Sequence, residues 1–124
     1  MQSDEKPLSI YGIQKSFSEQ LSNYYYIQYG INIKIARVYS CYGKGLKKQF
    51  LWDLCNKLTS NEKPILFGTG NEIRDFIHIS DTIKALKLFM YSKQSLRYID
   101  IGNGKGIKIK DIASTVYNNL RTYY

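Results

Sequence analysis

The stretch SIYGIQKSF, residues 9 to 17, places a tyrosine and a lysine four positions apart. If this segment is helical, Tyr11 and Lys15 share one face, because side chains at i and i+4 are neighbours on a helix. An ammonium beside a phenol favours the phenolate, which can accept a proton. The pair could therefore carry proton transfer. In a chain with 12 Tyr, however, such a spacing also arises by chance, and the rest of the sequence has to decide.

A rival candidate is the glycine-rich segment YIDIGNGKG, residues 98 to 106. A strand, a glycine turn and a helix present backbone N–H groups to phosphates in nucleotide-binding folds. The segment is also similar to the first motif of adenosylmethionine-dependent methyltransferases. Too few residues follow Gly106 for another βαβ unit, which takes about 30. We therefore interpret Gly102, Gly104 and Gly106 as a strand-to-helix turn and keep an adenosylmethionine-binding module as the weaker alternative.

The formal net charge of +8 raises the question of a nucleic-acid partner. Basic residues that bind phosphate backbones cluster on one face. Here they are scattered singly or in pairs, and LKKQF, residues 46 to 50, is the densest group. A solvated surface is the better interpretation, so we expect no nucleic acid as a partner.

Cysteine and histidine are too sparse for metal or disulfide chemistry. Cys41, Cys55 and the single His78 show no metal-ligand spacing, and we expect no metal site. No apolar run approaches the roughly 20 residues of a membrane helix, so no membrane partner is expected. The opening MQSDEKPLS lacks the apolar segment of a secretory signal, which makes the cytoplasm the default localisation.

Hydrophobic periodicity predicts alternating helices and short strands. Helices are expected over residues 10–29 with Gly30 as the stop, 47–59, from Ser80 or Asp81 as the cap to 91, and 110–122. Strands are expected over residues 31–37, 64–67, 76–79 and 97–101, with the glycine-containing segments YSCYGKG, GTGNEIRD and GNGKG as loops or turns. This alternation indicates an α/β fold with a parallel sheet.

Three segments in order decide between these readings: PLSIYGIQKSFSEQ, RVYSCYGKG and GTGNEIRDFIHISD. Together they resemble the NAD-dependent epimerase/dehydratase family, the extended short-chain dehydrogenases that modify nucleotide sugars. The resemblance implies the C-terminal portion of a Rossmann-like, doubly wound parallel sheet with part of the substrate-binding region. It implies one partial domain, in which about 1–60 end the Rossmann-like part and about 61–124 bind substrate.

The resemblance also implies a catalytic pair. Tyr11 would exchange a proton with a sugar hydroxyl while hydride passes to or from NAD or NADP. Lys15 would stabilise the phenolate and bond the nicotinamide ribose, and Tyr39 would contact the cofactor.

Three further residues match substrate positions of the family. Ser40 stands where the family usually has asparagine, which puts a substrate hydrogen bond in doubt. Phe67 matches the place of the nucleotide base. Arg74 matches an arginine that clamps the diphosphate, a task suited to a bidentate guanidinium. An ion pair of Arg74 with Asp75 or Asp81 is the alternative.

The family's G-x-x-G-x-x-G loop and its catalytic Ser or Thr precede the tyrosine, and neither occurs in these 124 residues. We therefore expect a fragment of an enzyme of nucleotide-sugar metabolism, such as surface-polysaccharide precursor synthesis, which is inactive alone and binds no NAD tightly. The full-length form would take a nucleotide-diphosphate sugar and form a homodimer through the helix of Tyr11. The alternative is a noncatalytic partner of a separate N-terminal half or of a paralogue.

Overall fold

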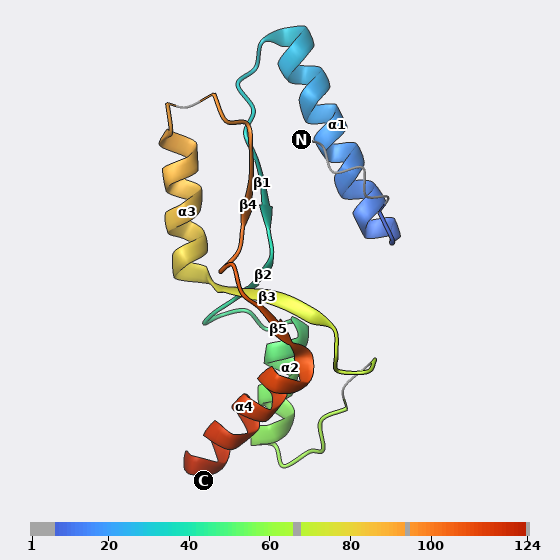
Figure 1. Cartoon of the computed structure of the whole chain (residues 1–124), viewed down its shortest axis with the longest axis vertical. Helices are drawn as coiled ribbons and strands as arrows, with labels where there is room; N and C mark the ends of the chain where they lie inside the picture. Colours follow the sequence, from blue (N-terminus) through green and yellow to red (C-terminus); the bar gives the residue numbers. More distant parts are fainter. Residues whose placement is uncertain (1–6, 66–67, 94, 124) are drawn as a thin grey trace. The chain divides into compact units, whose positions relative to one another are not determined.

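The computed structural model describes residues 7 to 65, 68 to 93 and 95 to 123. Helices and strands alternate along this described part (Figure 1), in the order α1 (Ile10–Tyr29), β1 (Ile35–Val38), β2 (Ser40–Tyr42), α2 (Gln49–Thr59), β3 (Ile73–His78), α3 (Ile79–Tyr91), β4 (Tyr98–Ile101), β5 (Gly106–Lys108) and α4 (Ile109–Tyr123). None of the helices found there has the length and apolar composition that a membrane span requires.

The chain divides into two compact units. The first unit comprises Met1–Ile35 and Gln94–Ile99, and the second comprises Ala36–Lys93 and Asp100–Tyr124. The predicted functional division near residue 60 therefore does not coincide with the division by contacts, and it stays a prediction.

The first unit is dominated by α1, whose two ends are set by local capping. Ser9 has extended backbone angles and its Oγ accepts a hydrogen bond from the Gly12 N–H at 3.1 Å, which satisfies a donor of the first turn. Gly30 ends the helix with φ 63°, and its N–H donates to the Tyr26 carbonyl at 3.1 Å. The predicted helix over residues 10–29 and its stop at Gly30 are confirmed.

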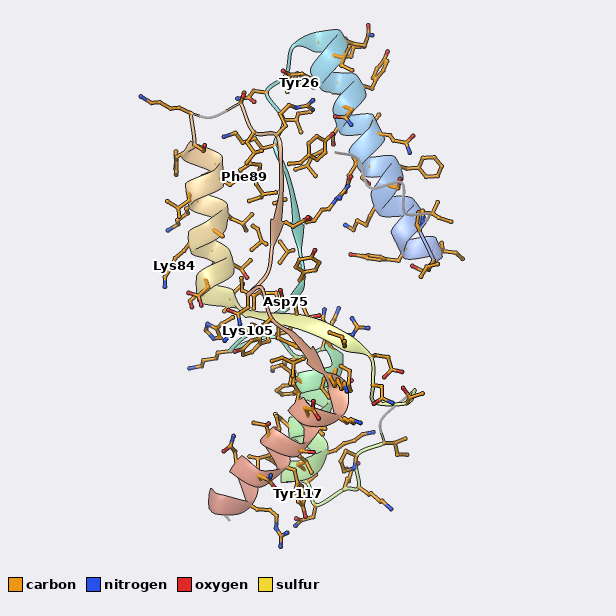
Figure 2. All side chains as sticks on the ribbon, viewed as in Figure 1. Tyr26, Asp75, Lys84, Phe89, Lys105 and Tyr117 are labelled. Atoms are coloured by element: carbon orange, nitrogen blue, oxygen red, sulfur yellow. The ribbon has the colours of Figure 1, made fainter. Side chains whose placement is uncertain are left out.

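The C-terminal half of α1 is tied to the start of β4 by polar contacts within the first unit. The Asn23 Oδ1 atom accepts hydrogen bonds from Arg97 Nη2 at 3.0 Å and from the Tyr98 hydroxyl. The Arg97 guanidinium also lies over the ring of Tyr26, which is labelled in Figure 2. These contacts fix α1 against the strand without burying any of its side chains, since none of its described side chains is buried.

The second unit is built on a three-stranded sheet with the order β2, β3, β5. The first half of β3 pairs antiparallel with β5, and its second half pairs parallel with β2. Helix α3 packs on β2 and β3, while α2 and α4 pack on each other (Figure 1). Among the residues of this unit that the structure describes, the buried apolar ones are few: Leu54, Ile77, Phe89, Ile101 and Ile109.

Strands β1 and β4 form a separate pair. The Ile35 N–H donates to the Arg97 carbonyl at 2.7 Å, and the Tyr39 N–H donates to the Ile101 carbonyl at 3.0 Å. Both bonds advance by the same number of residues along each strand, so the pair is parallel. The predicted α/β class with parallel strands is confirmed, and the antiparallel β5 makes the larger sheet a mixed one.

Several predicted boundaries are wrong. The strand expected over residues 31–37 is limited to β1, which begins at Ile35. Residues 40 to 42, expected in a loop, form β2. Gly106, expected as the last residue of a loop, begins β5, which continues through residues for which no element was predicted. Each of these strands has three residues and exists because β3 supplies its hydrogen bonds, a tertiary effect that local turn signals do not contain.

Two further expectations around β3 need correction. The strand predicted over residues 64–67 is not formed at Pro64 and Ile65, and its last two residues lie outside the described residues. The turn predicted over residues 68–75 ends earlier, because Ile73 already begins β3. Helix α3 is capped by His78 rather than by Ser80 or Asp81, since the His78 side chain accepts the Ser80 N–H.

Candidate functional site

Tyr11 and Lys15 lie on the first two turns of α1, on the same face of the helix. The Lys15 Nζ atom is 5.5 Å from the centroid of the Tyr11 ring, within reach of a cation–π interaction. The Tyr11 side chain is 68% exposed, so its hydroxyl is accessible to a ligand. The structure thus brings a cation next to an exposed phenol. Their catalytic roles stay a prediction.

Tyr39 and Ser40 lie where β1 gives way to β2 in the second unit. The Tyr39 side chain is 53% exposed, and its backbone N–H is bonded to the Ile101 carbonyl. Ser40 is half-buried and pairs with Phe76 of β3. The exposed phenol of Tyr39 is available to a ligand. Phe67, the predicted base contact, lies outside the described residues.

Arg74 lies on β3, opposite Ile107 of β5, and its side chain is exposed. The predicted alternative was an ion pair with Asp75 or Asp81. Asp81 instead pairs with Lys84, with Nζ 3.0 Å from Oδ1. Asp75, the next residue along the strand, directs its side chain to the opposite face, since successive strand residues alternate. Neither carboxylate therefore neutralises Arg74, and within residues 7–65, 68–93 and 95–123 no ion pair occupies its guanidinium.

Asp75 binds the glycine-rich loop that follows β4, a role that sequence reasoning missed. Its Oδ1 atom accepts the Asn103 N–H at 2.8 Å, and its Oδ2 atom accepts the Gly104 N–H at 2.9 Å. Asp75 and Lys105 of this loop are labelled in Figure 2. The two N–H groups that a phosphate would need are thus already bonded to a carboxylate of the same chain. This supports the interpretation of the segment as a structural turn.

The turn before β3 is held by Glu72. Its Oε1 atom accepts the backbone N–H of Thr69 at 2.9 Å and the Thr69 hydroxyl at 3.1 Å. These donors, the backbone N–H first, hold the pKa of the Glu72 carboxyl below its usual value. The carbonyl of Glu72 accepts the Ile109 N–H at 3.0 Å, which joins the turn to the start of α4. Glu72 therefore positions the strand that carries Arg74.

His78 and Asp81 mark the start of α3. The Ser80 N–H donates to His78 Nδ1 at 3.3 Å, and the Tyr42 ring lies edge-on to the imidazole with centroids 5.3 Å apart. The hydrogen bond and charge of Lys84 lower the pKa of the exposed Asp81 carboxyl. These contacts are structural, and they end β3 at the point where α3 begins.

Comparison with known proteins supplies the identity of the fold. The model of the NAD dependent epimerase/dehydratase family matches residues 1–102. This chain belongs to that family. The resemblance read from three short segments is confirmed.

Individual relatives agree with this assignment. The chain is 30% identical over 122 residues to a putative UDP-glucose 4-epimerase of Methanocaldococcus jannaschii, a match that covers 92% of this chain and 38% of the relative. It is 35% identical over 106 residues to a UDP-glucuronate 4-epimerase of Thermodesulfobacterium geofontis, covering 82% of this chain and 31% of the relative.

A solved structure extends the comparison to three dimensions. The UDP-glucuronic acid 4-epimerase of Bacillus cereus, determined with UDP-glucuronic acid and NAD, is similar with a TM-score of 0.87 at 28% identity, over 95% of this chain and 39% of that one. The chain thus spans well under half the length of the relatives it matches, and it shares with them the Rossmann-like fold of this part.

Proposed function

We propose that this chain supplies the proton-transfer and substrate-binding part of a nucleotide-sugar epimerase or dehydratase that uses NAD or NADP. The observation that carries the proposal is the position of the Lys15 ammonium over the exposed Tyr11 ring, in a chain that belongs to this family. Relatives with UDP-sugar names support a nucleotide-diphosphate sugar as the substrate.

In the proposed reaction, the first unit handles the proton. The Tyr11 phenolate takes a proton from a sugar hydroxyl and returns it on reduction, and Lys15 stabilises the phenolate by its charge. NAD, when bound, supplies the hydride acceptor. The second unit would contribute Tyr39 as a cofactor contact, Ser40 as a substrate hydrogen-bonding group and Arg74 as the diphosphate clamp.

The described residues suit only part of a dinucleotide. Within the first unit, the exposed side chains of Tyr11 and Lys15 have the polar chemistry that suits a nicotinamide ribose. Within the second unit, the exposed Tyr39 is a separate candidate contact. The loop amides of Asn103 and Gly104 are bonded to Asp75, so they offer no cradle for the pyrophosphate. Because the 124-residue sequence contains no G-x-x-G-x-x-G loop either, we propose that this polypeptide by itself neither binds NAD tightly nor turns over substrate.

An exchange of segments tests the catalytic role. The matching segment of the Bacillus cereus epimerase would be replaced by this chain, which gives a chimera called the exchanged enzyme. Turnover of UDP-glucuronic acid would be measured for the exchanged enzyme and for its Tyr11→Phe variant. We expect the phenylalanine variant to lose about 10²- to 10⁴-fold in kcat, the usual contribution of general acid–base catalysis. Tyr24→Phe, on the same helix, is the matched control and should keep its rate. Equal kcat for Tyr11→Phe and its parent would reject the proposal.

A second candidate, a noncatalytic partner, is favoured by one observation. The apolar side chains along α1 are exposed, including Ile10, Phe17 and Leu21, which suits pairing with another polypeptide or with a second copy of the helix. Purification of the chain with a stable protein partner but without turnover in the exchanged enzyme would favour this candidate over the catalytic one.

A further inference from the structure

Asp75 is the residue around which the loop after β4 is folded. Its backbone pairs with Gly106 in the β3–β5 ladder, while its carboxylate accepts the N–H groups of Asn103 and Gly104. Asp75 therefore holds the middle of the loop through its carboxylate and the start of β5 through its backbone. Gly104 has φ +78°, a conformation in which successive N–H groups can converge on one anion.

The same loop is packed against Tyr39. A Cβ atom on Gly102 would lie 2.4 Å from the Asp75 Oδ2 atom and 2.5 Å from the Tyr39 Cδ2 atom, so only glycine fits between them. The Tyr39 backbone is bonded to Ile101, the residue before Gly102, through its N–H. Ring and backbone of Tyr39 are thus both set by residues 101 and 102, while half of the side chain stays exposed.

We infer that Asp75 is a positioning residue, whose carboxylate holds the loop of residues 102 to 105 so that Gly102 fixes the ring of Tyr39. This deepens the proposed function, on which it rests for the role of Tyr39 toward NAD. It also assigns a structural role to Asp75, the acidic residue next to Arg74 in the sequence. Because its carboxylate is directed to the loop, on the opposite face of β3 from Arg74, Asp75 does not compete with an anion for the Arg74 guanidinium.

Replacement by asparagine has a particular signature. The Asn side chain has the same shape but one acceptor oxygen and one NH₂ donor, so it can accept only one of the two loop N–H groups and opposes the other. Asp75→Asn should therefore release one of the amides of Asn103 and Gly104, whereas Asp75→Ala should release both. A general loss of stability would instead release amides elsewhere as well.

The test is amide hydrogen exchange and proton NMR on the full 124-residue chain. In Asp75→Asn we expect one of the two loop amides to exchange at least about tenfold faster, because it has lost a charge-assisted hydrogen bond. The Gly102 α-protons should lose the ring-current shift that the adjacent Tyr39 ring imposes. The amides of Ile109 and Lys110, bonded to Glu72 and Gly70, should keep their rates and serve as internal controls.

Asp100→Asn, at an exposed carboxylate of β4, is the matched control variant and should change neither the loop amides nor the Gly102 shift. If Asp75→Ala does not fold, Gly102→Ala provides a second route. The added methyl group would meet both the Asp75 carboxylate and the Tyr39 ring, so the loop amides and the Tyr39 signals should change together. Unchanged exchange and an unchanged Gly102 shift in Asp75→Asn would overturn the inference. If Asp75→Asn has the expected effect on the loop amides but the exchanged enzyme shows no turnover, only the proposed function is rejected.

Discussion

The guanidinium carbon of Arg97 lies 3.5 Å from the centroid of the Tyr26 ring, and Nη2 of the same side chain donates to Asn23 at 3.0 Å. Arg97 thus makes a stacking contact and a hydrogen bond with residues one helical turn apart on α1. A planar guanidinium can stack flat on the ring while its N–H groups donate at its edge, whereas an ammonium has no planar face to stack. Together with the Tyr98 hydroxyl, which also donates to Asn23, this arginine just before β4 holds α1 in place within the first unit.

Replacing Arg97 should loosen α1. We expect Arg97→Ala to destabilise the C-terminal half of the helix by about 2 kcal/mol, because a close cation–π contact and a hydrogen bond from a charged group are lost. Amide exchange over residues 23 to 29 measures this. Arg121→Ala is the control, since Arg121 lies 5.5 Å from the exposed Tyr117 ring on α4 and should matter by less than about 0.5 kcal/mol. If Arg97→Ala and Arg121→Ala had equal effects, Arg97 would not be the residue that holds α1.

The N-cap of α1 should control the turn that carries Tyr11. Ser9→Ala removes the acceptor of the Gly12 N–H and should cost about 1 kcal/mol of helix stability, with faster exchange at Gly12. Ser9→Asp keeps an acceptor and adds a charge that suits the positive end of the helix. Far-UV circular dichroism and amide exchange should therefore show nearly the same helix content for Ser9→Asp as for the parent. If the first turn of Ser9→Asp frays as much as that of Ser9→Ala, the Ser9 side chain does not cap the helix.

Glu72 should make stability depend on pH. Its pKa is lowered in the folded chain by the Thr69 donors, so its contribution is fully present above the ordinary glutamate value of about 4.3 and is lost as the pH falls through the folded value. The difference in unfolding free energy between the parent and Glu72→Gln should be largest near neutral pH and shrink in acid. Thermal unfolding across this range measures it. Glu62→Gln, at another exposed glutamate, is the matched control, and an identical pH profile for both variants would exclude the Glu72 turn as the cause.

Arg74 should act on substrate binding more than on chemistry. In the exchanged enzyme, Arg74→Lys keeps the charge but loses the bidentate fork, and we expect the KM for UDP-glucuronic acid to rise about tenfold with kcat within about threefold. Steady-state kinetics separate the two parameters. Arg121→Lys is the control. A fall in kcat at unchanged KM would place Arg74 in the chemical step instead.

Sequence patterns predicted the helices better than the strands. The span of α1 follows from helical periodicity, an N-terminal serine and a terminal glycine, all of which are local signals. Strands β2 and β5 have three residues each and no such signal, because their hydrogen bonds come from β3, more than thirty positions away in the chain. Pairing between strands so far apart in the chain cannot be predicted from a short stretch of sequence.

The same distinction applies to the site. The proximity of Lys15 to Tyr11 follows from helix geometry alone, and the structure places the ammonium over the ring. The contact of Asp75 with Asn103 and Gly104 joins residues 28 and 29 positions apart, so the motif around Arg74 gave no reason to expect it. The partner of an acidic residue depends on which strands become neighbours.

Strand β3 changes partners between Asp75 and Phe76, where pairing with β5 ends and pairing with β2 begins. Inserting or deleting one residue at that point would turn every following side chain to the opposite face, because the strand repeats every two residues. Strand β3 could then keep its register with either β5 or β2, but not with both. The number of residues in β3 is thus under tighter constraint than their identity, and members of this family should vary in length at the surrounding loops and not within this strand.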